Sequence, residues 1–240
     1  MPLQNRPMNY DLEQRYRSLK QQIAQLSAQH KQPEPKLLAV SKKHSSEAIR
    51  ALHGLGQTEF GESYWQETEQ KIAQLGDLNI TWHFIGPIQS NKTRPIAENM
   101  DWVHSVDRLK IAQRLNDQRP DNLPPLNVCL QINLDDETSK SGVPTTTASE
   151  LAHAIAQLPR LTLRGLMCIP KRTENPTQQR AAFAKLRQLQ QQLINEGVSV
   201  DTLSMGMSGD MEAAIAEGSN YLRIGTALFG HRQKNVTNPS

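Results

Sequence analysis

Lys42 is the first residue whose type and position suggest chemistry. It ends the segment KLLAVSK, which covers 36–42. Because side chains alternate along a strand, Leu38, Val40 and Lys42 share one face of the predicted strand. An amine that continues an apolar stripe lies in a partly dry place, which favours the neutral form that attacks a carbonyl and forms a Schiff base. The alternative interpretation is a solvent-facing loop that contains Lys42 and Lys43.

Two glycine-containing segments farther along the chain are typical of a phosphate site. SMGMSGD, at 204–210, offers close backbone approach, the hydroxyl of Ser208 and the amides of a following helix. RIGTALFG, at 223–230, adds Gly225 and Thr226 as donors. Either segment alone could be an ordinary turn. At the ends of two successive strands, the pair favours phosphate.

Arg223 is the third candidate. It shares a strand face with Tyr221 and Gly225, and one face of a barrel strand points into a packed interior. A buried guanidinium stays charged and must have a partner. Either a ligand or an Asp or Glu of the protein can be that partner. His83, between two aromatic residues, could serve as a base, although a packing role is the simpler interpretation.

The sequence lacks the motifs of several protein classes. It has no GxxxxGK[ST], no GxGxxG that opens a helix, no GxSxG and no HExxH. These absences argue against ATP or dinucleotide binding, serine hydrolases and zinc proteases. Cys129 and Cys168 lie far apart in apolar surroundings without a CxxC motif. They indicate buried thiols rather than a zinc site or a disulfide.

Composition and charge narrow the class further. The 240 residues include 27 Lys and Arg against 24 Asp and Glu, a net charge of +3 with interspersed signs, so we expect no nucleic-acid partner. No run of about 18 apolar residues could span a membrane, and the polar N-terminus does not resemble a signal peptide. We therefore expect a cytoplasmic protein with one domain over 1–240, in which 1–8 and 233–240 are frayed termini.

The elements that must position these residues alternate along the chain. An amphipathic helix over 11–29 comes first, and the predicted strands follow at 36–41, 58–61, 80–85, 102–106, 126–134, 161–169, 202–206 and 221–225. The predicted helices between them cover 45–55, 64–75, 90–99 with a bend near Pro95, a stretch capped by Asp107 that runs through Arg119, 147–158, 176–196 and 210–217. The segment 135–144 is predicted to be a loop.

This alternation predicts an α/β protein. Eight strand–helix units favour a single (β/α)8 TIM barrel with an extra N-terminal helix, because an open doubly wound sheet normally has fewer strands. In a barrel, functional residues lie at the carboxyl ends of the strands. Lys42, Ser208 and Thr226 follow such ends, so we expect them to meet at one rim.

Six segments, in this order, closely resemble the pyridoxal phosphate homeostasis proteins. They are LLAVSK at 37–42, FGESYWQE at 60–67, WHFIGPIQSNK at 82–92, LQINLDDETSKSGV at 130–143, LRGLMCIP at 163–170 and SMGMSGDMEAAIAEGSNYLRIGTALFG at 204–230. The resemblance implies a protein of fold type III that binds pyridoxal 5′-phosphate (PLP). Its barrel would be similar to the N-terminal domain of alanine racemase, without that enzyme's second domain.

The resemblance also implies roles for individual residues. Lys42 would hold PLP as the internal aldimine, and Arg223 would face the pyridine nitrogen. The other implied contacts are Ser208, Gly225 and Thr226 to the phosphate, and Met207, His83 and Asn91 beside the ring or behind it. Lys140 would be a second lysine near the mouth of the site, which transfers or accepts PLP.

Two residues depart from the family's usual pattern. Ser63 stands where Asn is usual, and His44 stands two residues after the Schiff-base lysine, where another lysine is common. Both departures leave the principal PLP ligands in place. They put in doubt the finer contacts and any shuttling role for a lysine at the second position.

The implied function is storage and delivery of PLP, which keeps amino-acid and keto-acid metabolism in balance. A guanidinium keeps the pyridine nitrogen neutral and weakens PLP as an electron sink, so we expect no established enzyme activity. Partners would be PLP and, transiently, apo-PLP enzymes, and the protein would be a monomer. The alternatives are an amino-acid racemase with weak activity and a cofactor-free aldolase in which Lys42 attacks a phosphorylated sugar.

Overall fold

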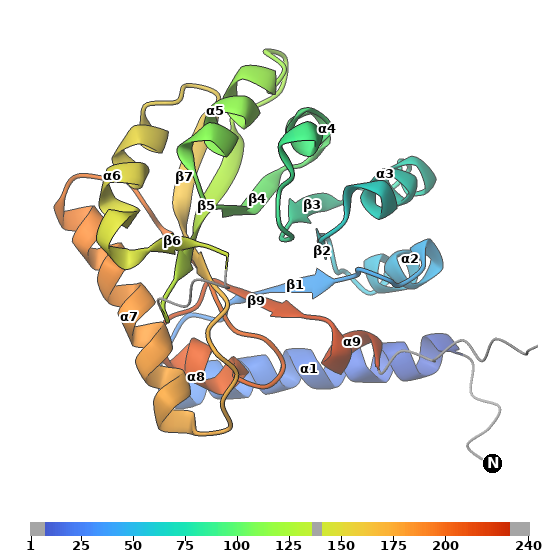
Figure 1. Ribbon diagram of the computed structural model, residues 1–240. Coiled ribbons are helices and arrows are strands. Elements are labelled where there is room, and N and C mark those ends of the chain that lie inside the picture. The colour runs from blue at the N-terminus through green and yellow to red at the C-terminus, as the bar shows by residue number, and fades with distance from the viewer. Residues whose placement is uncertain (1–7, 136–140, 231–240) are drawn as a thin grey trace, which may run out of the picture.

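The computed structural model describes residues 8–135 and 141–230, and it is a closed barrel of eight parallel strands with helices around it (Figure 1). The barrel strands are β1 Lys36–Val40, β2 Glu59–Glu62, β3 Thr81–Phe84, β4 Trp102–Val106, β5 Leu126–Asn133, β7 Leu161–Cys168, β8 Thr202–Ser204 and β9 Tyr221–Ile224. They neighbour one another in chain order, and β1 also pairs with β9, which closes the ring. The predicted TIM barrel is therefore confirmed.

Helices cover the outside of the barrel. They are α1 Met8–His30, α2 Ser46–Gly54, α3 Trp65–Gln74, α4 Thr93–Asn99, α5 Leu109–Gln118, α6 Thr145–Ala156, α7 Pro176–Asn195, α8 Met211–Ala216 and α9 Thr226–Phe229. The predicted extra helix, α1, lies along α8 and α9 (Figure 1). It buries Leu12, Leu19 and Ile23, which recur at helical spacing. Within the described ranges, none of these helices combines the length and the apolar character needed to cross a bilayer.

Local sequence sets several helix starts. The Ser45 hydroxyl accepts a hydrogen bond from the amide of Ala48 and caps α2. Helix α7 begins with Pro176, and the Asn175 side chain accepts from two amides of the first turn. Proline suits this position because the first amides of a helix have no acceptor within the helix.

Four details differ from the sequence-based expectation, two of them within predicted helices. The predicted helix over 90–99 is divided into a 3₁₀ turn, Ser90–Lys92, and α4, so that Pro95 lies in the first turn of α4, where its missing N–H costs nothing. Asp107 does not cap α5. Arg108 is the N-cap, and the Asp107 carboxylate pairs with the Arg108 guanidinium at 2.7 Å instead.

The other two differences are short elements that periodicity did not predict. A two-residue strand, β6 Val143–Pro144, pairs with the end of β5 inside the segment expected to be a loop. Helix α9 has four residues. Elements of this length contain only about one period, too little for a repeating pattern, so the pairing with β5 and the packing on α1 create them. Of the expected frayed termini, 1–7 and 233–240 lie outside the described residues, whereas Met8 begins α1.

The barrel interior contains a small apolar cluster and a polar one. Leu38, Trp102, Cys129, Met167 and Tyr221 form the apolar cluster. Cys129 and Cys168 are free, buried thiols, as the sequence predicts. Burial raises the pKa of both thiols to about 12, so neither ionises near neutral pH.

Five buried or half-buried polar residues, here called the interior polar chain, connect the two ends of the barrel. They are Glu59, His83, His104, Ser204 and Arg223. Glu59 Oε2 lies 3.1 Å from His83 Nε2, and His83 Nδ1 lies 2.9 Å from His104 Nε2. His104 Nδ1 lies 2.7 Å from Ser204 Oγ, which accepts from Arg223 Nη1 at 2.8 Å. Three hydrogen bonds and, at the Glu59 end, one ion-pair contact therefore connect Glu59 to Arg223.

Burial governs the protonation of this chain. Burial lowers the pKa of His83, although the Glu59 carboxylate acts to raise it. Burial also lowers the pKa of His104 well below its usual value. Burial opposes ionisation of Glu59, but hydrogen bonds from His83 and Lys36 outweigh it and hold the Glu59 pKa at about 2. Both imidazoles are therefore neutral at pH 7, and Glu59 is a carboxylate.

This protonation pattern predicts a loss of stability in weak acid. The pKa of both imidazoles is lower in the folded protein than in the unfolded chain. Below about pH 6.5 the unfolded chain therefore binds more protons, and the unfolding free energy falls as pH falls. Between pH 7 and 5.5 we expect the buried pair to cost about 2 kcal/mol, roughly half of it from His104. Urea denaturation across this range should give a shallower pH dependence for His104→Asn than for the wild type. Equal slopes would contradict the assignment.

Candidate functional site

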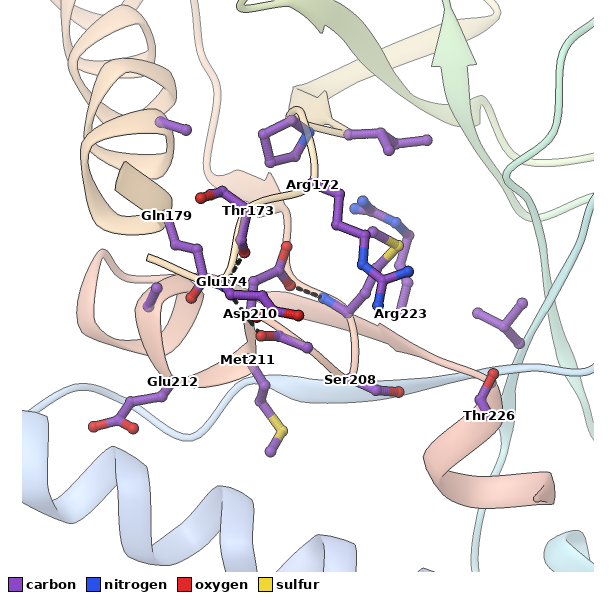
Figure 2. Close-up of a pocket in the computed structure, with 18 of the residues that line it drawn as sticks. Arg172, Thr173, Glu174, Gln179, Ser208, Asp210, Met211, Glu212, Arg223 and Thr226 are labelled. Atoms are coloured by element: carbon purple, nitrogen blue, oxygen red, sulfur yellow. Dashed lines mark hydrogen bonds between the residues drawn. The ribbon is translucent and has the colours of Figure 1, made fainter. Parts of the chain in front are cut away.

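A cavity of about 1570 Å³ opens at the carboxyl ends of β1, β7, β8 and β9. Six of the predicted site residues line it: Lys42, Met207, Ser208, Arg223, Gly225 and Thr226. Figure 2 shows Arg223, Ser208 and Thr226 around this space, with Arg172 from the loop after β7 above them. Residues more than 160 positions apart in the chain therefore meet at one rim, as the barrel topology requires.

The structure does not bring His83 and Asn91 to this cavity. His83 is fully buried in the barrel interior, and Ile85, one step nearer the strand end on the same face, is the residue that reaches the cavity wall. Asn91 is exposed in the 3₁₀ turn before α4. A direct contact from either residue to a ligand in the cavity therefore has no support from the geometry. Lys140 lies outside the described residues.

Arg223 is held by neutral acceptors rather than by a carboxylate. Its Nη1 donates to the Ser204 carbonyl at 2.5 Å and to the Ser204 hydroxyl at 2.8 Å, and its Nη2 donates to the Cys168 carbonyl at 2.7 Å. Among the described residues, no Asp or Glu forms an ion pair with it. A guanidinium has five N–H donors, so Nε–H and one Nη2 hydrogen remain for a ligand.

The loop after β8 is built to expose backbone and hydroxyl donors. Gly206 has φ +96°, and a Cβ there would lie 2.5 Å from Ala214 Cβ, so only glycine fits. The Asp210 carboxylate accepts from the Met207 amide at 2.6 Å and fixes the turn that carries Ser208 (Figure 2). The Ser208 hydroxyl is exposed to the cavity and has no hydrogen-bond partner within the described part of the chain.

Thr226 begins α9, which follows β9, the strand next to β8 in the barrel. Its backbone amide belongs to the first turn of the helix and has no acceptor within it. Helix α9 is tied to α1, because Arg15 Nε donates to the Leu228 carbonyl at 2.9 Å. The N-terminal helix thus fixes one half of the predicted phosphate site from outside the barrel.

Lys42 lies in a tight turn directly after β1. The Ser41 amide donates to the Gly61 carbonyl at 3.0 Å, and the His44 amide donates back to the Ser41 carbonyl at 2.9 Å. Lys43 takes the left-handed conformation, with φ +64°. The turn is therefore fixed at both ends, with the partly buried Lys42 in the cavity wall.

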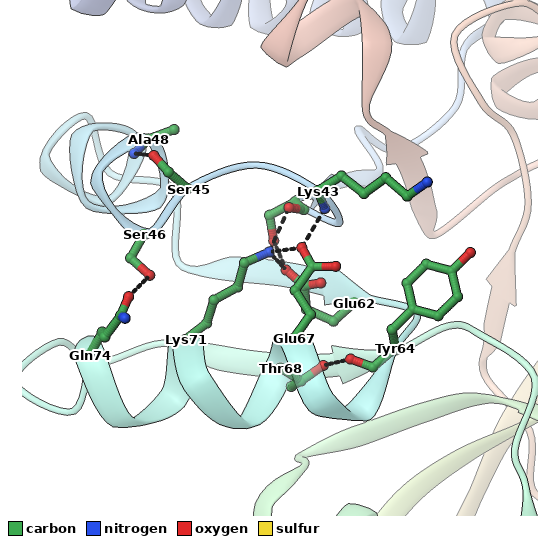
Figure 3. Close-up of polar contacts among 11 residues, drawn as sticks. Lys43, Ser45, Ser46, Ala48, Glu62, Tyr64, Glu67, Thr68, Lys71 and Gln74 are labelled. Carbon is green, nitrogen blue, oxygen red and sulfur yellow. Dashed lines mark hydrogen bonds and ion pairs between the residues drawn. The ribbon is translucent and has the colours of Figure 1, made fainter. Parts of the chain in front are cut away.

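A buried charge cluster supports this turn from below (Figure 3). Lys71 Nζ, on α3, donates to Glu62 and Glu67 at 2.6 Å each, and to the Ser41 carbonyl at 2.8 Å. Ser41 Oγ donates to Glu62 at 2.6 Å, and the Lys43 amide donates to Glu67. Sequence reasoning missed this cluster, although Glu67 and Lys71 have the spacing of a helical ion pair.

The protonation of Glu62 depends on Lys71. Burial raises the pKa of Glu62, and the Lys71 ammonium and the Ser41 hydroxyl work in the opposite direction. Glu62 is fully buried, and its Oε2 has no hydrogen-bond partner among the described residues. Removal of Lys71 would therefore leave an uncompensated carboxyl group beneath the Lys42 turn.

The two departures from the family pattern have defined places. The His44 ring stacks on Phe229, with centroids 4.3 Å apart and planes 13° apart, so it links the Lys42 turn to α9. Ser63 lines the cavity, and its backbone packs against Gly86, where a Cβ would lie 2.2 Å from the Ser63 carbonyl oxygen. Neither residue displaces Lys42, Ser208 or Arg223.

Comparison with known proteins places the chain in a family. The model of the alanine racemase N-terminal domain matches residues 15–233. The chain is 60% identical to the pyridoxal phosphate homeostasis protein of Pseudomonas aeruginosa, over 82% of this chain and 84% of that protein. It is 50% identical to the one of Vibrio cholerae, over 90% and 97%. The chain belongs to the pyridoxal phosphate homeostasis protein family.

Solved structures agree with this assignment to the pyridoxal phosphate homeostasis protein family. PipY of Synechococcus elongatus with PLP bound is 36% identical and superposes with a TM-score of 0.82, over 91% of this chain and 100% of that chain. Alanine racemase of Corynebacterium glutamicum has a TM-score of 0.73 at 16% identity, over 93% of this chain but 62% of that chain. At this identity, the racemase shares the barrel fold alone.

The charge cluster predicts that Lys71 holds the Lys42 turn in place. We expect Lys71→Met to lower the unfolding free energy by about 3 kcal/mol, because it leaves the Glu62 carboxyl group buried without a cation. Chemical denaturation measures this loss. Lys185→Met, at an exposed position of α7, is the matched control and should change stability by less than about 0.5 kcal/mol. Equal effects of the two variants would contradict the role of Lys71.

Proposed function

We propose that this protein binds PLP through a Schiff base on Lys42 and acts as an intracellular PLP carrier in vitamin B6 homeostasis. One observation carries the proposal: one cavity is lined by Lys42, Ser208, Thr226 and Arg223, which reach the rim from the ends of three strands, β1, β8 and β9. The names of the relatives in Pseudomonas aeruginosa and Vibrio cholerae support it, as does the PLP bound to PipY.

The donors of the cavity fit the three functional groups of PLP. The amine of Lys42 suits the aldehyde, with which it forms the Schiff base. The Ser208 hydroxyl and the Thr226 hydroxyl and amide, which have no acceptor among the described residues, suit the phosphate. The two unused N–H groups of Arg223 suit the pyridine nitrogen, which can only accept.

Arg223 favours a carrier over an enzyme. A guanidinium stays charged and donates, so it leaves the pyridine nitrogen unprotonated and makes bound PLP a weak electron sink. Within the described ranges, no Asp or Glu pairs with Arg223, so none of them is placed there to protonate the pyridine nitrogen. We further propose that the barrel works as a monomer that transiently meets apo-PLP enzymes and thereby keeps amino-acid and keto-acid pools in balance.

The Schiff base is tested by the visible absorption of protein that has been incubated with PLP and dialysed. The wild type should retain a yellow band, and Lys42→Ala should lose it. Lys43→Ala is the matched control, because Lys43 adjoins Lys42 but does not line the cavity. A band that persists in Lys42→Ala would mean that another lysine holds the aldehyde, with Lys140 the first candidate. No band in any variant would overturn the PLP proposal.

The loaded wild type then tests the carrier role. When it is mixed with a PLP-dependent apoenzyme, the apoenzyme should regain activity while the protein loses its band. A small-molecule aldehyde trap in the same mixture distinguishes direct transfer from release into solution. If loaded protein never restores the apoenzyme, the delivery half of the proposal fails, although PLP binding stands.

The phosphate half of the site makes a separate prediction. The double variant Ser208→Ala/Thr226→Val should bind PLP about tenfold more weakly, because it loses hydroxyl donors to a charged group. Binding of pyridoxal, which has no phosphate, should change by less than about twofold. Absorbance titrations measure both affinities. Thr162→Val, at the opposite end of β7, is the matched control, and an equal loss for both ligands would contradict the assignment.

A further inference from the structure

The interior polar chain is a buried feature that the proposed function leaves unexplained. Its members come from five strands: Glu59 from β2, His83 from β3, His104 from β4, Ser204 from β8 and Arg223 from β9. Both histidines and Ser204 are completely buried. Two imidazoles inside a barrel are unusual, because each must find a partner for both ring nitrogens. The chain gives three of the four ring nitrogens a hydrogen-bond partner, and the fourth, His83 Nε2, faces the Glu59 carboxylate at ion-pair distance.

The Glu59 end fixes the first hydrogen. Glu59 is a carboxylate and can only accept, so the hydrogen in its 3.1 Å contact with His83 belongs to His83 Nε2. Glu59 Oε2 and His83 Nε2 have no hydrogen-bond partner among the described residues, so this ion-pair contact is what faces each atom. Lys36, at the start of β1, donates to the other carboxylate oxygen at 2.7 Å. The carboxylate therefore terminates the chain.

Each later hydrogen follows from the one before it. A neutral His83 with hydrogen on Nε2 must accept at Nδ1, so His104 Nε2 donates to it across 2.9 Å. His104 must then accept at Nδ1, so the Ser204 hydroxyl donates to it across 2.7 Å. The lone pairs of Ser204 Oγ remain for Arg223, which donates at 2.8 Å. The three hydrogen bonds run in one direction, from Arg223 to His83, and the ion-pair contact with Glu59 continues it.

If the hydrogen bonds ran in the opposite direction, from His83 to Ser204, polar groups of the chain would lack partners. If His83 carried a second proton, His104 would have to donate from Nδ1 to Ser204. The Ser204 oxygen would then face two donors, and its own hydrogen would have no acceptor among the described residues. The charged groups that face His83 are Glu59, Lys36 and Asp101, and His104 faces Arg223. A buried imidazolium near two cations is further disfavoured by burial itself.

We propose that Glu59, His83, His104 and Ser204 form a directional hydrogen-bond chain that locks both imidazoles with hydrogen on Nε2 and holds Arg223 in the orientation in which it meets its ligand. The ligand part of this inference rests on the proposed function. His104 and Ser204 are positioning residues, because they act through Arg223. The Ser204 hydroxyl, committed to His104, always presents a lone pair to Nη1, which leaves Nε–H and one Nη2 hydrogen directed to the cavity.

The first experiment uses the apoprotein, so it does not depend on PLP. Long-range ¹H–¹⁵N correlation spectra distinguish the two neutral tautomers of histidine and the imidazolium. We expect both buried rings to show hydrogen on Nε2 and none on Nδ1, unchanged from pH 6 to pH 9. Hydrogen on Nδ1 of either ring, or an imidazolium in this range, would overturn the proposal.

Variants then test the connection to Arg223. Ser204→Ala should shift the His104 Nδ1 signal, because that atom loses its donor, and it should weaken PLP binding about tenfold. Ser27→Ala is the matched control and should change neither readout, because Ser27 is a buried serine of α1 whose hydroxyl has no partner among the described residues. Unchanged ring signals and unchanged affinity in Ser204→Ala would overturn the proposal.

A pair of substitutions at His104 separates positioning from packing. In His104→Asn, the side-chain oxygen can take the place of Nδ1 and accept from Ser204, whereas His104→Leu offers no acceptor. PLP affinity should stay close to the wild-type value in His104→Asn and fall about tenfold in His104→Leu. Equal losses would reduce His104 to a packing residue. If wild-type protein shows the expected tautomers but binds no PLP, the proposed function fails and the directional chain stands.

Discussion

The solvation of one buried cation, the Arg223 guanidinium, is the constraint on which the barrel interior depends. A guanidinium keeps its proton in proteins, so its burial requires acceptors on the surrounding strands. The carbonyls of Cys168 and Ser204, at the ends of β7 and β8, provide them. The remaining acceptor is the Ser204 hydroxyl, which in turn needs an acceptor for its own hydrogen, and the interior polar chain continues from there to Glu59.

A buried acid beneath Lys42 needs compensation in the same way as the buried cation Arg223. Glu62 is a fully buried acid, and Lys71 provides the ammonium that compensates it. Because Lys71 also donates to the Ser41 carbonyl, the charge pair and the turn that carries Lys42 form one unit. The stack of His44 on Phe229 then joins this unit to α9. Two electrostatic clusters thus hold the two sides of the cavity independently of any ligand.

The polarity of the rim follows from these clusters. Arg223, Ser208 and the Thr226 amide can all donate, and Lys42 supplies the nucleophilic amine, so the groups suit a ligand rich in acceptors. Among the described residues, no Asp or Glu pairs with Arg223 that could share a proton with the ring nitrogen of such a ligand. This is the physical basis on which we propose a carrier rather than an enzyme that needs a strong electron sink.

Much of the site was predictable from local patterns. Lys42, Ser208 and Thr226 follow predicted strand ends, and Gly225 is the last residue of a predicted strand. Parallel strands in a barrel bring those ends together whatever the side chains between them. The strand and helix order needed only hydrophobic periodicity. Short elements such as β6 and α9 were not predictable, because they contain only about one period and form by pairing with β5 or packing on α1.

The sequence by itself determined the order of elements, the closed parallel sheet and the chemistry available at its rim, because these follow from periodicity along the chain and from residue types at strand ends. Only the tertiary structure decided the partners of the buried charges. His83 was a candidate for the site and lies instead in the interior, and Lys71, which showed no signal beyond a helical ion pair, supports the Lys42 turn. Such partners lie on different strands, and their contacts depend on register and closure, which no local pattern encodes.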